Sequence, residues 1–237
     1  MKKAEGAAAY AGLLNAAWGA AKSLFDYRKV DETLKQRLPG ADLRSAVVIF
    51  VAAMLLGAVL SLIIYIESLY FAAFSYKTLA ELAGSTVEPQ PDFSTLGQFA
   101  LFLALSSAIV FLACLFQDGI AYYALRLTGG KGTFTRQYYL SSLVALSMAI
   151  SSAIMIFGVV PCAGALAFFA YVAMTLYLMF WVRCRAYAMV HGLSGLHVFV
   201  IVFLSCIPTV ALLLAANGAA AGALHLPQAA YYNMSGV

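Results

Sequence analysis

The stretch "AVVIFVAAMLLGAVLSLIIYI", residues 46–66, decides the fold class of this chain. It contains no charged side chain and has the length, about 20 residues, that a helix needs to cross the hydrocarbon core of a bilayer. Four further apolar segments of similar length follow, at residues 99–122, 138–160, 162–182 and 196–216. A backbone in lipid must satisfy its own hydrogen bonds, so each segment is predicted to be a helix. We therefore predict an all-α integral membrane bundle of five transmembrane helices.

The composition of the whole chain agrees with a membrane protein. Hydrophobic residues make up 64% of the sequence and charged residues 10%, whereas an ordinary soluble domain carries about a quarter charged residues. The sequence contains no H-E-x-x-H, G-x-S-x-G or C-x-x-C motif, and its basic residues are not clustered on a soluble face. We expect no enzyme, no cofactor, no metal site and no nucleic-acid partner.

Lysine and arginine residues are distributed unevenly among the loops. One side of the predicted bundle has Arg28, Lys29, Lys35, Arg37 and Arg44 before the first span, Arg126, Lys131 and Arg136 between the second and third, and Arg183 and Arg185 between the fourth and fifth. The opposite side has Lys77 alone. Because basic loops stay in the cytoplasm, the N-terminus is predicted to be cytoplasmic and the C-terminus to lie outside or in a lumen.

Residues 1–44 are predicted to form a cytoplasmic segment separate from the five-helix domain of residues 45–237. Leu14, Trp18, Ala21 and Phe25 recur at helical spacing, so this segment is expected to contain an amphipathic helix that lies in the membrane interface. A basic start followed by small residues also fits a secretory signal. Polar residues interrupt its apolar part, which favours the amphipathic helix.

The loop "LRLTGGKGTFTRQYYL", residues 125–140, places three glycines and a lysine between two spans. A phosphate-binding loop requires G-x-x-x-x-G-K-[ST], but here Lys131 is followed by Gly132. We predict a hairpin in which Gly129 and Gly130 supply a left-handed, tight backbone at the end of the second span. Thr133 or Thr135 is then expected to cap the third span.

The basic residues of the loops have a second predicted role. Those nearest the spans are expected to contact anionic headgroups or protein partners. They are Arg126, Lys131, Arg136, Arg183 and Arg185.

Asp118 is the one acidic residue well inside a predicted span, and it is the candidate intramembrane polar site. A carboxylate at this depth requires a partner or a water-filled recess. Tyr122, one helical turn away, can offer a hydroxyl, and Gln117 adjoins it. One interpretation is a proton or ion site; the other, which we favour, is a protonated or snorkelling acid near the cytoplasmic leaflet. Serines in the second and third spans could add a polar path.

Three motifs resemble those of the YIP family of polytopic membrane proteins, named for interaction with Ypt/Rab GTPases. They are "LRLTGGKGTFTRQYYLSSLVAL" at 125–146, "VVPCAGAL" at 159–166 and "YAMVHGLSGLHVFVIVF" at 187–203. The resemblance implies that Pro161 and Gly192 are turn residues, like the loop glycines. Leu196 and His197 depart from the family, which often has a basic residue and then alanine there.

The resemblance also implies a function. It is that of a non-catalytic protein acting in membrane organisation or trafficking through lipids, other membrane proteins, a small GTPase in a eukaryote, or homo- or hetero-oligomers. The membrane would be the cell membrane in a prokaryote and the Golgi or ER membrane in a eukaryote. The alternative is a small transporter or channel that uses Asp118 and the serine-lined helices.

Overall fold

The computed structural model describes residues 2–82, 96–159 and 163–223. It has five long helical segments. Three of them are single helices: α3 (Leu43–Leu82), α4 (Leu96–Leu127) and α8 (Gly195–Ala223). The third segment joins α5 (Phe134–Ser151) to the 3-10 helix η2 (Ser152–Val159), and the fourth joins α6 (Ala163–Leu176), the π-helical η3 (Tyr177–Val182) and α7 (Arg183–His191). Each is long and apolar enough to cross a membrane. The described residues contain no strand. The predicted all-α bundle of five spans is therefore confirmed, and the protein is a multi-pass membrane protein.

The helices run further than the apolar segments that predicted them. The fourth apolar run ends at Val182, but the helix continues through α7 to His191. Arg183 and Arg185 therefore lie in a helix and not in a loop as predicted. Hydropathy marks only the apolar part of a helix. The backbone can stay helical beyond that part, where polar side chains such as Arg183 lie within the same helix.

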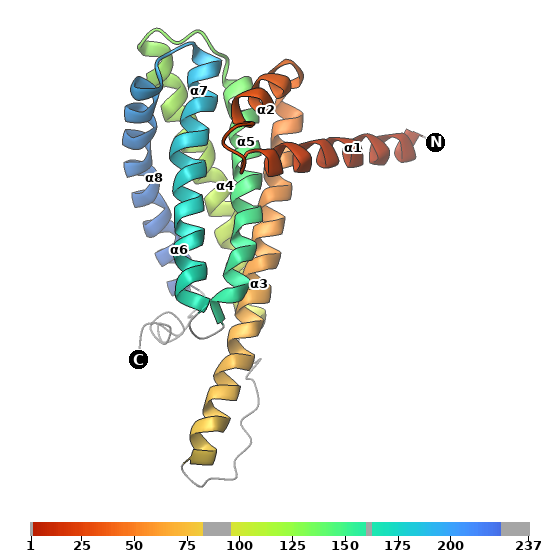
Figure 1. Ribbon diagram of the computed structural model, residues 1–237, viewed down its shortest axis with the longest axis vertical. Coiled ribbons are helices and arrows are strands. Elements are labelled where there is room, and N and C mark those ends of the chain that lie inside the picture. Colours follow the sequence, from red (N-terminus) through yellow and green to blue (C-terminus); the bar gives the residue numbers. More distant parts are fainter. Residues whose placement is uncertain (1, 83–95, 160–162, 224–237) are drawn as a thin grey trace.

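Two shorter helices precede the bundle, as expected for the N-terminal segment: α1 (Lys2–Ser23) and α2 (Val30–Arg37). Figure 1 shows α1 extending sideways from the bundle, across the direction of the long helices. Its last turns are anchored in the core, where Ser147 donates to the carbonyl of Ala21 at 3.0 Å. Tyr177 donates to the carbonyl of Leu24 at 3.2 Å. Trp18, placed on the apolar stripe by sequence, is 38% exposed.

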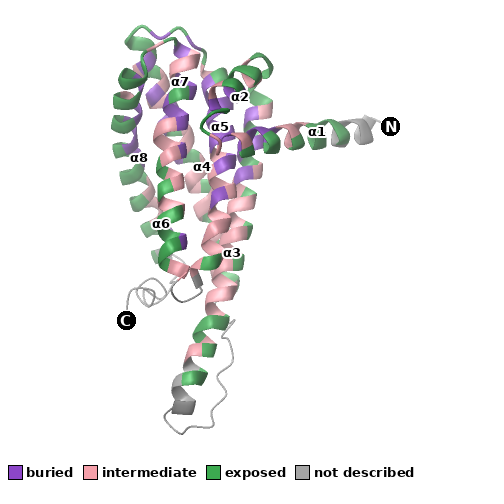
Figure 2. Ribbon diagram, in the orientation of Figure 1, coloured by how far each residue is buried: buried purple, intermediate pink, exposed green. Residues whose placement is uncertain are grey.

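The core occupies one end of the bundle. Buried residues gather where α1, α2 and the α4–α5 and α7–α8 loops lie, while the opposite half is mostly intermediate or exposed (Figure 2). Leu34, Phe50, Leu125 and Tyr187 belong to this single buried cluster. The last turns of α1 and helix α2 are therefore packed onto the five-helix domain and share its core.

The start of α3 is fixed by a local cap. Ser45 donates its backbone N–H to Asp42 Oδ1 at 2.8 Å and its hydroxyl to Oδ2 at 2.5 Å. These hydrogen bonds hold the pKa of the Asp42 carboxyl below its usual value, so it stays ionised at the positive end of the helix. The next residue but one, Arg44, bonds to the Tyr10 hydroxyl of α1, which ties the two helices together.

Candidate functional site

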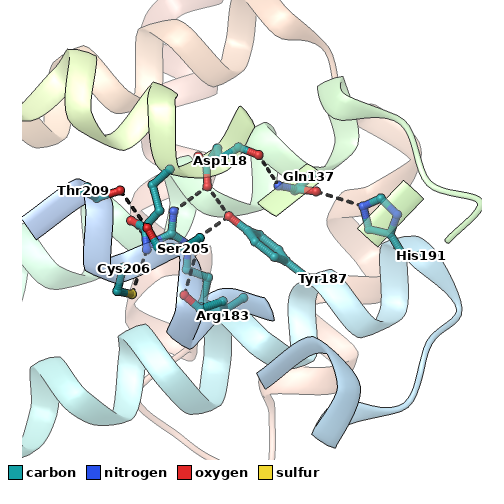
Figure 3. Close-up of polar contacts among 10 residues, drawn as sticks. Asp118, Gln137, Arg183, Tyr187, His191, Ser205, Cys206 and Thr209 are labelled. Atoms are coloured by element: carbon teal, nitrogen blue, oxygen red, sulfur yellow. Dashed lines mark hydrogen bonds and ion pairs between the residues drawn. The ribbon is translucent and has the colours of Figure 1, made fainter. Parts of the chain in front are cut away.

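A buried ion pair between Asp118 of α4 and Arg183 of α7 lies in the packed end of the bundle (Figure 3). Asp118 is fully buried and Arg183 is 7% exposed. Asp118 Oδ1 accepts hydrogen bonds from Arg183 Nη2 and from the Tyr187 hydroxyl. Because a buried charge is costly unless it is paired and hydrogen-bonded, this arrangement explains how the bundle holds both groups.

Neighbouring polar groups hold the guanidinium in place. Arg183 Nε donates to the Tyr187 hydroxyl at 2.9 Å, and Nη1 donates to Gln117 Oε1 at 2.9 Å. Arg183 and Tyr187 are four residues apart on α7 and so share one helix face. Gln117 and Asp118 are adjacent on α4. Two helices thus contribute two polar residues each to one fixed network.

Two interpretations of Asp118 from the sequence are replaced by this geometry. The carboxylate does not snorkel toward a leaflet, because it is enclosed and its charge is balanced by Arg183. Tyr122 is not its partner; the Tyr122 ring packs against Phe134 with centroids 5.6 Å apart. Arg183, predicted to contact lipid or a protein partner, is turned inward. Its burial follows from the attraction of opposite charges in a medium of low dielectric.

The sequence did contain a signal for this pair. Asp118 and Arg183 each lie roughly two helical turns before the ends of α4 and α7 at the same side of the bundle. Two opposite charges at matched depth in neighbouring spans predict a contact. Counting Arg183 among the loop residues hid that match.

The network continues to His191 through Gln137 (Figure 3). Gln137 Nε2 donates to the backbone carbonyl of Asp118 at 2.9 Å, and its Oε1 lies 2.8 Å from His191 Nε2. Since that amide oxygen can only accept, the hydrogen-bond pattern assigns the proton to Nε2 of His191. Gln137 is fully buried. The side chain of α5 therefore links α4 to the end of α7.

The glycine-rich loop packs against the end of α7 beside this network. The N–H of Lys131 donates to the carbonyl of His191 at 3.1 Å. A Cβ atom on Gly130 would lie 2.7 Å from His191 Nδ1, and one on Gly132 would lie 2.4 Å from a methyl of Val190. These two positions accept only glycine without movement of a neighbour. Two of the motifs noted in the sequence thus meet in space.

Two other glycines set the backbone at helix ends. Gly129 has φ +100° and Gly192 has φ +67°, so both are left-handed, a conformation that side chains disfavour. Gly192 ends α7. Thr133 accepts from the N–H of Arg136 at 3.4 Å and caps α5. Pro161 lies outside the described residues.

The remaining basic candidates are at the surface. Arg126, Lys131 and Arg136 are exposed. Arg185 is half-exposed, pairs with Asp31 of α2 at 2.6 Å and lies 4.4 Å over the Trp181 ring. Arg185 therefore fastens α2 to the bundle. The charges of Arg126, Lys131 and Arg136 are exposed at the surface of the packed end.

A cavity of about 250 Å³ adjoins the ion pair, with Arg183 and Gln117 in its lining. Its wall also includes residues from two irregular helices: the π-helical η3 and α8, which contains Pro208. Among the described residues no group of His, Cys, Asp and Glu is arranged to hold a metal ion. The site can therefore offer hydrogen bonds and a volume with mostly apolar walls. Comparison of the chain with protein-family models, curated proteins and solved structures finds no match.

We predict that Asp118→Asn destabilises the fold by about 3 to 5 kcal/mol, because it leaves the Arg183 charge buried without a counter-charge. The double variant Asp118→Asn, Arg183→Met should recover most of this loss, since no charge remains. Thermal unfolding in detergent measures both. The matched control is Asp31→Asn, which breaks a half-exposed pair and should cost about 0 to 1 kcal/mol. Equal losses for the single and double variants would contradict the ion-pair account.

We also predict a graded response at the loop glycines. Gly129→Ala should cost about 1 to 2 kcal/mol because of its left-handed backbone, and Gly130→Ala about 1 to 3 kcal/mol because its Cβ overlaps His191 and the carbonyl of Leu125. Gly195→Ala, with nothing within 4 Å of its Cβ, should cost nothing. The same unfolding measurement ranks the three, and a loss at Gly195 as large as at Gly130 would refute this reading.

Proposed function

We propose that this chain is a non-catalytic, YIP-like membrane protein that acts in membrane organisation or trafficking through contacts with lipids and other membrane proteins. The observation that carries the proposal is the concentration of exposed basic side chains at the packed end of the bundle, where α1 and α2 also lie. This end has the chemistry of a surface held against a negatively charged membrane.

The charge at this end is strongly unbalanced. Among the described side chains the exposed or half-exposed bases here are Lys22, Arg28, Lys29, Lys35, Arg37, Arg44, Arg126, Lys131, Arg136 and Arg185, and the acids are Asp26, Asp31, Glu32 and Asp42. Cytoplasmic leaflets carry anionic lipids, and each nearby Lys or Arg is worth about 1 kcal/mol there. The proposal therefore puts this end and the N-terminus in the cytoplasm and the C-terminus outside or in a lumen.

The direction of α1 supports the same placement. The helix runs across the long helices (Figure 1), as a helix lying along a membrane surface would. Tyr10 and Trp18 are exposed on it, and Lys22 Nζ lies 5.3 Å over the Trp18 ring. Aromatic rings with a cation beside them are typical of the headgroup region.

The YIP resemblance gains support from contact between its motifs. The glycine-lysine-glycine loop and the HGLS loop pack together through Gly130, Gly132 and His191, so two short motifs far apart in sequence form one structural unit. The partners proposed from the resemblance are membrane lipids, other membrane proteins, a small GTPase in a eukaryote, and further copies in homo- or hetero-oligomers. The membrane is then the cell membrane of a prokaryote or the Golgi or ER membrane of a eukaryote.

The lipid part of the proposal is tested in nanodiscs that contain a mixture of anionic and zwitterionic lipids. The triple variant Arg126→Gln, Lys131→Gln, Arg136→Gln should retain clearly fewer anionic lipids when native mass spectrometry counts the lipids bound to the released protein. Lys77→Gln, at the opposite end, is the control and should retain as many as the unmodified protein. Unchanged retention by the triple variant would remove the support from this proposal.

A second candidate, a small transporter or channel, is favoured by one observation. A π-helical turn at Tyr177–Val182 and Pro208 inside α8 make two continuous spans locally irregular beside a cavity with a polar end. π-helical turns often mark functional sites.

Flux measurements in reconstituted vesicles separate the two candidates. We expect no proton- or ion-driven flux from the unmodified protein, because Arg183 neutralises Asp118 and occupies the polar end of the cavity. A flux that disappears in the Asp118→Asn, Arg183→Met double variant would establish transport instead. The double variant is used because it keeps the buried site neutral and so removes the charge without leaving a partner unpaired.

A further inference from the structure

The cavity beside the ion pair has an apolar body. Its walls come from α3, α4, α5, η3, α7 and α8, and it has a volume of about 250 Å³. The apolar lining consists of Phe50, Val110, Val144, Ala145, Met148, Met179, Val210 and Leu213. A well-packed interior leaves few voids larger than a water molecule. A space of this size and lining suits hydrocarbon and not water, because water requires several polar partners.

One end of the cavity is polar and carries unused donors. Arg183, Gln117, Ser141 and Cys206 line it. A guanidinium has five N–H groups, and the hydrogen bonds of Arg183 to Tyr187, Gln117 and Asp118 use three of them. Nη1 and Nη2 each keep one further N–H. Gln117 has its own partners, since its amide nitrogen lies 2.9 Å from Cys206 Sγ. The ion pair therefore has spare donors on Arg183 and, on Asp118 Oδ2, one buried acceptor without a partner.

The charge of the ligand follows from the ion pair. Asp118 already neutralises Arg183, so an added carboxylate or phosphate would leave a net negative charge in a medium of low dielectric. An added cation would face the guanidinium. A neutral acceptor, such as a hydroxyl or an ester carbonyl, can receive hydrogen bonds from these N–H groups without a charge penalty.

The cavity also reaches the outside of the bundle. Val210, which lines it, is 48% exposed, and in this multi-pass protein that outer surface lies within a transmembrane segment. The wall near this point is irregular, because Cys206 and Thr209 flank Pro208, which cannot donate to the carbonyl four residues before it. A molecule can therefore enter sideways from the hydrocarbon of the bilayer.

From these features we propose that the cavity binds one hydrocarbon chain of a neutral lipid, with the hydroxyl or ester carbonyl at the head of that chain accepting hydrogen bonds from Arg183. This binding site does not depend on the proposed role in membrane organisation. The apolar walls take up the chain, and the ion pair selects a neutral head over an anionic one.

The test uses the full chain in nanodiscs and a long-chain alcohol that carries a photoreactive diazirine on its chain. Irradiation should attach the probe to peptides of α5 and α8 that line the cavity. Ala145→Phe, which fills the cavity, should reduce this labelling by about tenfold. Ala211→Phe makes the same change at an exposed position of α8 and should leave labelling within about twofold. Labelling that survives Ala145→Phe, or that is absent from these peptides, overturns the proposal.

Competition tests the head group. Dodecanol should displace the probe about tenfold better than dodecanoate, for which the charge penalty applies, and better than dodecane, which has no acceptor. Arg183→Lys keeps the charge for Asp118 but replaces the five N–H groups by three, all needed by existing partners. It should abolish the preference for dodecanol over dodecane while the protein remains folded by thermal unfolding. Equal or better competition by dodecanoate in the unmodified protein contradicts the proposed selectivity.

A second probe distinguishes the source of the chain. A two-chain phosphatidylcholine with the diazirine on one chain competes with the single-chain alcohol for the same peptides, and the mass of the adduct shows which molecule is bound. Adducts of either probe that respond to Ala145→Phe support the site. Adducts of neither rule it out.

Discussion

The buried ion pair between Asp118 and Arg183 is the interaction on which the packed end of the bundle depends. Charges taken out of water are costly, and their attraction offsets the cost only in a fixed geometry supported by further hydrogen bonds. Tyr187 and Gln117 supply such bonds to Arg183 and to Asp118 Oδ1, while Asp118 Oδ2 is buried without a partner. The pair therefore sets the depth of α4 relative to α7, since a shift of one helical turn would separate the charges.

The loops follow from that alignment. Once α4 and α7 lie at matched depth, the chain leaving α4 must pass directly over the end of α7, where Gly130 and Gly132 leave no room for a Cβ. His191 then contacts both sides, with its carbonyl bound to Lys131 and its ring bound to Gln137. A short glycine-rich loop that first suggests a phosphate site is explained by the closeness of two helices.

The division of the bundle into a packed half and an open half has consequences for function. Polar residues, the N-terminal helices and the exposed bases are gathered at one end, while the long helices present mostly apolar, incompletely buried surface toward the other (Figure 2). The cavity lies beside the ion pair. The polar guanidinium of Arg183 therefore borders a space suited to hydrocarbon.

The sequence by itself determined the five spans and the N-terminal helix. It also placed a left-handed backbone at Gly129 and Gly130 and a helix cap at Thr133 or Thr135, of which the structure has Gly129 left-handed and Thr133 as the cap. These features depend on length of apolar run or on bonds between near neighbours, which a one-dimensional pattern records. The sequence places Asp118 and Arg183 at similar depths, but only the tertiary structure decided that these two residues face each other and that a cavity opens beside them. It alone decided, too, that Gly130 and Gly132 serve close approach. Those contacts join residues on different helices, and their energy depends on distance and on the exclusion of water, neither of which a count of charges along the chain contains.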